Sequence, residues 1–173
     1  KSKKENLTVL TNKDDWKDYF IQNDNVQSYG NDQAEVIDYG IFDDEGHPLG
    51  TFDNKDIVTL KSKIKFNEDV NDPIFTMTIK DFQGNDITGN NTEFEKKQTG
   101  KFKKGDVAVC EFRQNIPVGA GRYTLSFSCT HYDKNGNLEV LNRKYDAILV
   151  EVISSKSYVG MFKIDSDITI SKL

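Results

Sequence analysis

The stretch Asn71–Thr92, NDPIFTMTIKDFQGNDITGNNT, carries the pattern that decides the fold of this chain. Its central part, Ile74–Phe82, alternates between apolar and polar residues with the period of two that is typical of a strand with one buried face. The apolar members are Phe75, Met77 and Ile79. The polar members are Thr76, Thr78 and Lys80. A Gly84-Asn85 turn follows, so the stretch predicts a half-buried strand that turns into a second strand.

Similar short segments recur from about Val26 to the end of the chain, with turn residues between them. We expect strands at Ala34–Phe42, Asp56–Phe66, Ile74–Phe82, Ile87–Thr92, Val107–Gln114, Arg122–His131, Asn142–Val152 and Asp167–Ser171. Asn135-Gly136 is a strong signal for a two-residue hairpin turn. Short strands at regular spacing indicate an all-β sandwich or barrel with mainly antiparallel pairing.

The first residues lack this pattern. We expect residues 1–25 to form a linker and residues 26–173 to form one β module. Asn12 is placed to cap a short helix at Lys13–Gln22, whose aromatic residues lie near one face. These aromatic residues are Trp16, Tyr19 and Phe20. The pattern favours a docking segment or linker over a binding site.

Length and charge set the class of protein. The 173 residues suit one domain, or one domain with a short appendage, and can bury a core without disulfides or metals. The net charge of −5 argues against a nucleic-acid partner, because phosphate binding needs clustered cations. No apolar run approaches the roughly 18 residues of a membrane-spanning helix. We expect no signal peptide, and the missing initial Met fits a fragment of a longer chain.

The two cysteines, Cys110 and Cys129, lie in strand-like stretches among apolar residues. We expect buried free thiols, which favours a cytosolic setting. The alternative is a disulfide between neighbouring strands, which would require an oxidising compartment.

Motifs for catalysis are missing from the chain. We find no Gly-x-Ser-x-Gly, no His-Glu-x-x-His and no phosphate-binding glycine loop. Cys129-Thr130-His131 is a lone Cys/His pair, whereas zinc requires about four ligands. Asp43-Asp44-Glu45 lacks the spacing of a calcium-binding EF-hand, so we interpret it as a hairpin turn. A carboxylate pair for glycoside hydrolysis stays open, because strands bring distant residues together, but the sequence favours a protein that is not an enzyme and has no cofactor.

Several short motifs, taken in order, resemble the C-terminal domain of Wzt, the ATPase subunit of bacterial ABC transporters that export O-antigen. The motifs that carry the resemblance are Tyr29–Val36, Asn71–Phe75, Ile79–Asp81, Gly84, Gly89–Thr92, Gly105-Asp106, Gly121–Ser126 and Gly160. The resemblance covers roughly Val26–Leu173, and similar domains occur in exporters of cell-wall polysaccharides such as rhamnans.

The resemblance implies a carbohydrate-binding module with an immunoglobulin-like or jelly-roll β-sandwich. In the family, the module follows a nucleotide-binding domain, which binds ATP and Mg²⁺, and works with a membrane permease subunit. It recognises lipid-linked glycan on the cytoplasmic side of the membrane as a peripheral protein. This chain has no phosphate-binding loop, so it would be the module alone.

A sheet face with short polar groups and aromatic rings suits a sugar ligand. The candidate glycan contacts are Thr76, Thr78, Lys80, Ser126, Ser128, Thr130, Tyr132 and Tyr145. The first six lie on the polar faces of two predicted strands, with Lys61 and Lys63 as further neighbours. The two tyrosines lie near strand ends. Ordinary sheet surface is the competing interpretation for each Thr and Ser.

The sequence also predicts an assembly state and leaves two alternative functions open. The β-like stretch Asp167–Ile170 near the terminus could add to a sheet edge of another copy, so we expect a homodimer. Strand exchange at the C-terminus is also what the family resemblance implies. The alternative function is a structural or dimerisation module that couples the exporter to glycan-synthesis enzymes, and a glycoside-active enzyme is a third hypothesis.

Overall fold

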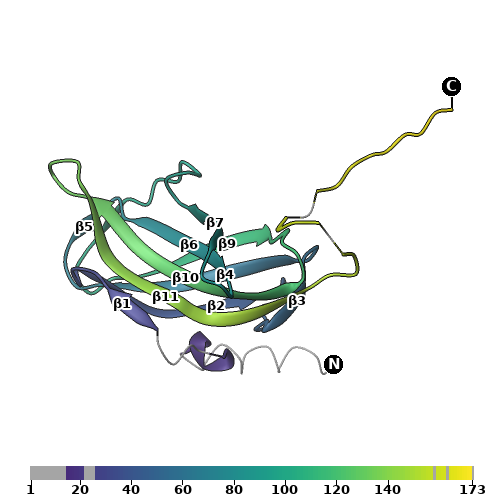
Figure 1. Ribbon diagram of the computed structural model, residues 1–173. Helices are drawn as coiled ribbons and strands as arrows, with labels where there is room; N and C mark the ends of the chain where they lie inside the picture. The colour runs from purple at the N-terminus through teal and green to yellow at the C-terminus, as the bar shows by residue number, and fades with distance from the viewer. Residues whose placement is uncertain (1–14, 22–25, 158, 163, 173) are drawn as a thin grey trace, which may run out of the picture.

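The structure is a computed structural model that describes residues 15–21, 26–157, 159–162 and 164–172. Figure 1 shows a β-sandwich with one short 3-10 helix against it. The elements are η2 (Trp16–Tyr19), β1 (Gln27–Tyr29), β2 (Ala34–Phe42), β3 (Thr51–Asp53), β4 (Ile57–Phe66), β5 (Val70–Asn71), β6 (Ile74–Asp81), β7 (Asp86–Asn91), β8 (Lys101–Phe102), β9 (Val107–Asn115), β10 (Gly121–Tyr132) and β11 (Leu138–Ile153). The predicted all-β class is confirmed.

Two sheets face each other across the core. The larger has six strands in the order β1-β11-β10-β6-β7, with β3 paired to β11 off this path. The opposing sheet has the order β2-β4-β9, and β5 and β8 form a two-stranded ribbon. All pairs are antiparallel except β3 with β11, which confirms the antiparallel β-sandwich.

The stretch Asn71–Thr92 supplies β6 and β7. Phe75, Met77 and Ile79 are buried between the sheets, as their alternation predicts. Across the core, the rings of Tyr39 and Phe127 stack with centroids 5.4 Å apart. A period-two pattern therefore becomes a two-sheet core because each sheet has one apolar face to bury.

Three hairpin turns share the pattern Asp-x-x-Gly-x. In each, one carboxylate oxygen accepts the backbone N–H groups two and four residues later, at 2.8–2.9 Å. The turns begin at Asp43, Asp81 and Asp133. Their glycines have φ between 81° and 86°, a left-handed conformation that favours glycine. The turn interpretation of Asp43-Asp44-Glu45 is thereby confirmed.

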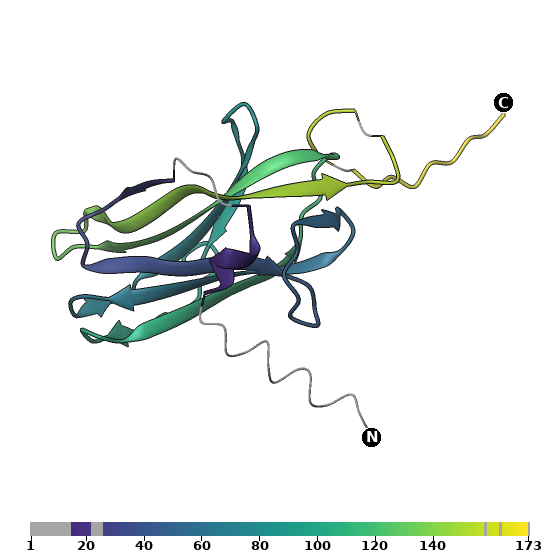
Figure 2. The ribbon, with the colours of Figure 1, turned by 90° about the horizontal axis from the view of Figure 1, so that it is seen from below.

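The N-terminal segment docks on the outer face of the three-stranded sheet (Figure 2). Asp38 on β2 is buried and accepts the backbone N–H groups of Trp16 and Lys17, both at 2.9 Å. Phe20 is buried beside Gly40, where a Cβ atom would come within 2.6 Å of its ring. Of the predicted helix Lys13–Gln22, the described part forms only the 3-10 turn Trp16–Tyr19, and Asn12 lies outside the described residues.

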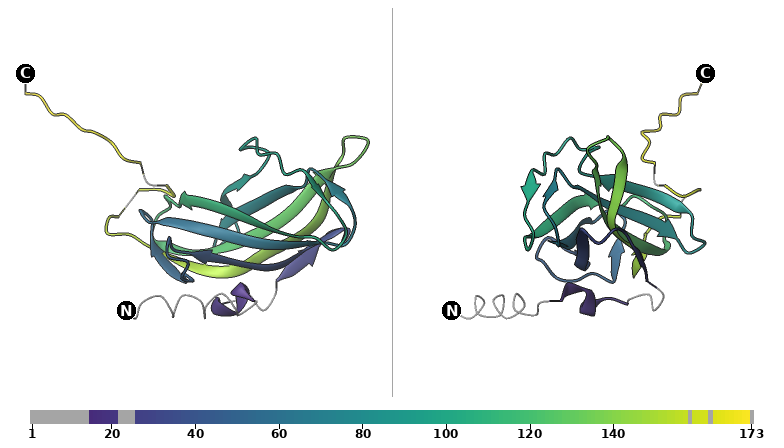
Figure 3. Two further views of the ribbon diagram at one scale, coloured as in Figure 1. Left: turned by 180° about the vertical axis from the view of Figure 1, so that it is seen from behind. Right: turned by 90° about the vertical axis from the view of Figure 1, so that its left-hand side faces the viewer.

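The C-terminal segment differs from its prediction. No strand forms at Asp167–Ser171, and residues 164–172 run away from the sandwich in an extended path (Figures 1 and 3). A strand needs a partner edge, and residues 164–172 pair with none in the single copy. The predicted strand is therefore wrong for the chain by itself.

Both cysteines are free, as predicted. Cys129 is buried in the core and Cys110 is half-buried. Burial raises the pKa of each thiol to about 12, so both stay protonated near neutral pH.

Candidate functional site

The outer face of the six-stranded sheet carries a continuous polar surface, which we call the polar face. Pairing of β6, β10 and β11 sets neighbouring side chains in rows across it. Ser128 lies between Thr76 on β6 and Arg143 on β11. Thr124 lies beside Lys80 in the same way. The polar residues of the alternating strands thus meet on one side, because their apolar neighbours occupy the core.

An aromatic and cationic cluster forms the centre of this face. The rings of Tyr29 on β1 and Tyr145 on β11 stack with centroids 5.7 Å apart. The Arg143 guanidinium lies 5.3 Å from the Tyr145 ring and 5.8 Å from the Tyr29 ring, and its Nη1 donates to the Tyr145 hydroxyl at 2.9 Å. Lys80 Nζ lies 4.7 Å from the Tyr145 ring centroid. Two cations therefore contact one tyrosine.

The hydrogen bonds of the cluster shift both phenols. The hydrogen bond from Arg143 lowers the pKa of Tyr145, with further lowering from its hydrogen bond to Tyr29 and from the positive charges nearby. The hydrogen bond to Tyr145 raises the pKa of Tyr29. In the described part of the chain, no carboxylate lies within ion-pair distance of Arg143, and Asp86 approaches Lys80 only to 3.9 Å. Both cations are thus placed to bind oxygen atoms of a ligand.

The candidate contacts from the sequence divide into three groups. Thr76, Thr78 and Lys80 lie half-buried on the polar face, as expected, while Tyr145, expected near a strand end, lies half-buried in the middle of β11. Ser126, Ser128 and Thr130 also point to this side but are only 3–5% exposed, whereas the sequence pattern suggested open surface. They lie on the central strand β10, where larger side chains of β6 and β11 screen small ones. Tyr132 is 49% exposed and lies at the far end of β10, with its hydroxyl 3.5 Å from Glu93.

A bulge on β11 gives Ser126 a structural role. The register between β10 and β11 shifts between Leu125 and Phe127, and Asp146 adopts φ of 49° there. Ser126 Oγ accepts the backbone N–H of Asp146 at 2.8 Å. Asp146 Oδ1 accepts the Thr124 hydroxyl at 2.7 Å. The bulge therefore turns a carboxylate onto the polar face, a common use of β-bulges.

Sequence reasoning missed Tyr29, Arg143 and Asp146. Arg143 lies two residues before Tyr145, so the two share a face of one strand, and this spacing could have identified it. Tyr29 belongs to the cluster only because β1 pairs with the middle of β11. Asp146 would face the core in a regular strand, and the bulge reverses it. The sequence offers no signal for that bulge.

A hollow lies at each end of the polar face. One, of about 330 Å³, is lined by residues that include Asp81, Phe82, Thr124 and Asp146. The other, of about 320 Å³, includes Ile74, Thr92 and Tyr132 in its wall. The polar face thus extends from one cavity to the other along β10.

Neither a metal-binding cluster nor a membrane-spanning helix occurs in the described ranges. No group of three His, Cys, Asp or Glu side chains there is arranged to hold a metal ion. None of the helices formed by the described residues is long and apolar enough to cross a membrane.

Comparisons with known proteins agree with the fold. A crystal structure described as that of the C-terminal domain of Wzt matches with a TM-score of 0.76 and 24% sequence identity, covering 87% of this chain and 91% of that one. No curated protein sequence matches the chain significantly. The family model of the Wzt C-terminal domain matches residues 25–164. The chain therefore belongs to the Wzt C-terminal domain family, whose members are non-catalytic modules of polysaccharide ABC transporter subunits.

Proposed function

We propose that this chain is a glycan-binding module that recognises a lipid-linked cell-surface polysaccharide for export. The observation that carries the proposal is the cluster of Tyr29, Tyr145, Arg143 and Lys80 on the polar face. Aromatic rings pack against the apolar C–H face of a pyranose, while Arg and Lys donate hydrogen bonds to its oxygen atoms. The cluster combines both on a pre-formed surface, which lowers the entropic cost of binding.

The shape of the polar face suits an extended chain of sugars. From Thr124 to Tyr132 the strand β10 covers eight residue steps, or about 26 Å at roughly 3.3 Å per residue. Thr76 and Thr78 lie beside this line with their hydroxyl groups half-buried. A polymer of several units could therefore contact the cluster and the neighbouring hydroxyl groups together. The candidate polymers are an O-antigen or a rhamnose-type cell-wall glycan.

The setting follows from the family and is part of the proposal. Residues 26–173 would form the module, and residues 1–25 the end of a linker from an ATPase domain that binds ATP and Mg²⁺. The full-length protein would bind a membrane permease subunit and act as a peripheral protein at the cytoplasmic face of the membrane. We expect no nucleic-acid partner, because the net charge is −5.

Calorimetry with the polysaccharide purified from the source strain tests the proposal. We expect saturable binding that weakens about tenfold in Tyr145→Ala, because the substitution removes the ring that both cations contact. Phe94→Ala is the control, since Phe94 is 72% exposed and lies outside the cluster, in the turn after β7. A native polymer that shows no binding to the wild-type module would contradict the proposal.

A second function, dimerisation, is favoured by the C-terminal segment. Ile164, Ile168 and Ile170 are 81%, 78% and 92% exposed, and the segment makes no strand pairing in the single copy. We propose a homodimer in which this segment adds to a sheet edge of the other copy. Light scattering should show a dimer that becomes a monomer when residues 165–173 are deleted. A stable monomer, unchanged by the deletion, would contradict this assembly.

A further inference from the structure

The cavity beside the bulge has the features of a separate sugar-binding site. It lies where the turn after β6, the start of β10 and the bulge of β11 meet, and its volume is about 330 Å³. Three of its walls are apolar side chains, those of Ile21, Phe82 and Leu149. Its polar lining includes Thr124 and Asp146. Such a mixture of an apolar wall and a few placed polar groups is typical of small-molecule sites.

Asp146 is the polar group available to a ligand. Its Oδ1 accepts the Thr124 hydroxyl at 2.7 Å, which orients the carboxylate, and the structure shows no partner for its Oδ2 in the described part of the chain. Asp81, the other carboxylate of the cavity wall, differs: its two oxygens accept hydrogen bonds from Gln83 and Asn85 within its own turn. Asp146 also sits at φ of 49°, a conformation that costs energy for a residue other than glycine.

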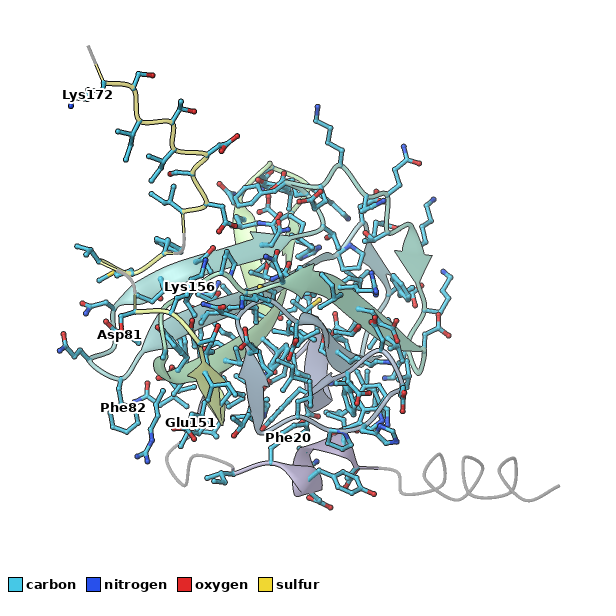
Figure 4. The ribbon with its side chains drawn as sticks, turned by 90° about the vertical axis from the view of Figure 1, so that its right-hand side faces the viewer. Phe20, Asp81, Phe82, Glu151, Lys156 and Lys172 are labelled. Carbon is cyan, nitrogen blue, oxygen red and sulfur yellow. The ribbon has the colours of Figure 1, made fainter. Side chains whose placement is uncertain are left out.

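Phe82 supplies the aromatic surface. It is 69% exposed on the turn after β6, and Figure 4 shows its side chain at the edge of the sandwich, away from the core. The Asp81 turn fixes the backbone on both sides of it through three hydrogen bonds of 2.8–2.9 Å. An exposed ring on a rigid turn can stack on a sugar with little loss of entropy.

We propose that this cavity binds one neutral, hydroxyl-rich sugar residue, with its C–H face against Phe82 and its hydroxyl groups donating to Asp146. The carboxylate accepts hydroxyl hydrogen bonds and repels a uronate or phosphate group. This inference adds a subsite to the polar face and rests on the proposed glycan function. Its charge is opposite to that of the Arg143 and Lys80 cluster, so the two parts of the surface select different chemical groups.

The test is a two-dimensional amide NMR titration of the folded chain with methyl glycosides. The neutral probes are the methyl glycosides of glucose, mannose, galactose and rhamnose, and the anionic probe is that of glucuronic acid. We expect at least one neutral probe to shift the amides of Phe82, Gly84 and Thr124, and the glucuronide to leave them unchanged at the same concentration. Phe82→Ala should weaken the neutral probe about tenfold, and Asp146→Asn, which also tolerates positive φ, at least threefold.

Phe94→Ala is the matched control, because Phe94 is 72% exposed, close to the 69% of Phe82, and lies on a different loop. Equal weakening by both Phe substitutions, or no cavity shifts by any neutral probe up to 100 mM, would overturn the inference. Amides of Tyr29, Arg143 and Tyr145 report on the central cluster independently. Shifts confined to those amides would overturn the cavity site while supporting the proposed function of the polar face.

Discussion

Both outer faces of the sandwich place cations over aromatic rings, but the two faces differ in whether a carboxylate lies close to the cation. On the three-stranded sheet, Lys63 lies over the Trp16 ring at 4.1 Å and pairs with buried Asp38 at 3.0 Å. On the six-stranded sheet, Arg143 lies over two tyrosines, and the structure gives it no carboxylate partner among the described residues. The first arrangement is internally neutralised and covered by the N-terminal segment, so it serves stability. The second leaves its positive charge without a carboxylate among the described residues, which is the basis of the proposed glycan site.

A second pair of residues repeats the contrast. Lys61 on the three-stranded sheet lies 5.4 Å from the Phe42 ring and binds Glu111 at 2.8 Å. Lys80 on the other sheet lies 4.7 Å from the Tyr145 ring, with Asp86 only at 3.9 Å. A cation over a ring is therefore no sign of a binding site by itself. The two faces differ in the distance from each cation to the nearest carboxylate.

The largest expected effect is on stability at the three-stranded face. Lys63→Ala removes the ammonium group that lies 3.0 Å from Asp38, whose side chain is 2% exposed, so a nearly buried carboxylate loses an ion-pair partner. We expect a loss of about 2–3 kcal/mol in the free energy of unfolding, below the full range for buried pairs because Lys63 is partly exposed. Urea denaturation measures it. Glycan binding should stay within twofold of wild type, and a large loss of binding without loss of stability would break the comparison.

The next effect is on binding at the six-stranded face. Arg143→Gln should weaken polysaccharide binding about tenfold, or roughly 1.4 kcal/mol, because no carboxylate of the described residues pairs with the guanidinium, which leaves it available to the proposed ligand. Calorimetry measures it. Lys61→Gln on the opposite face is the matched control and should leave affinity unchanged. Equal losses in the two variants would show that the faces do not differ in function.

A smaller effect separates structural from ligand-facing residues within the polar face. Ser126→Ala leaves the backbone N–H of Asp146 without its acceptor at 2.8 Å, so we expect about 1 kcal/mol of destabilisation. Ser128 is also buried, but its side chain forms no hydrogen bond with the residues that the structure describes, and Ser128→Ala should cost less. Thermal unfolding of both variants, followed by circular dichroism, gives the difference. If Ser128→Ala proved the more harmful, the assigned role of the bulge would be wrong.

The smallest expected effect is on stability at acid pH, to which the three Asp-x-x-Gly-x turns contribute. Hydrogen bonds within the turns, from His47, Asn85 and Asn137 first of all, lower the pKa values of Asp43, Asp81 and Asp133. Each turn therefore contributes stability that is fully present above the unfolded pKa of about 3.9 and is lost as the pH falls through the lower folded pKa. Melting temperatures between pH 6 and pH 2.5 measure this loss.

Asp133→Ala tests the cause of that pH dependence. The variant should melt lower at pH 6 and lose less stability on acidification, because it lacks one of the three carboxylates. Lys134→Ala, in the same turn, is the control, since its side chain takes no part in the hydrogen bonds to Asp133. An acid slope that is the same in Asp133→Ala as in wild type would contradict the assignment.

Much of the fold was predictable, and the site only in part. The alternation in β6 and β10 predicted both strands and their buried faces, since period-two burial is a local property. It also placed Thr76, Thr78 and Lys80 on the polar side, whereas the position of Tyr145 follows from the course of the long strand β11. The burial of Ser126, Ser128 and Thr130 was not predictable from alternation, because it depends on which strand lies at the centre of the sheet. The predicted strand at Asp167–Ser171 was wrong because a strand also needs the edge of another strand to pair with, and the sequence of the segment does not reveal such an edge.

The sequence by itself determined the all-β class, the alternating core and the positions of the turns. These follow from periodicity and from side chains that bond to their own backbone within five residues, as at Asp81 and Asp133. Only the tertiary structure decided that Tyr29, Arg143 and Lys80 meet at Tyr145, because these residues come from three strands. It also decided that Asp146 faces the cavity, since the bulge depends on the register of β10 against β11. Strand order and register are set by contacts between residues far apart in the sequence, and they decide which side chains gather on the polar face.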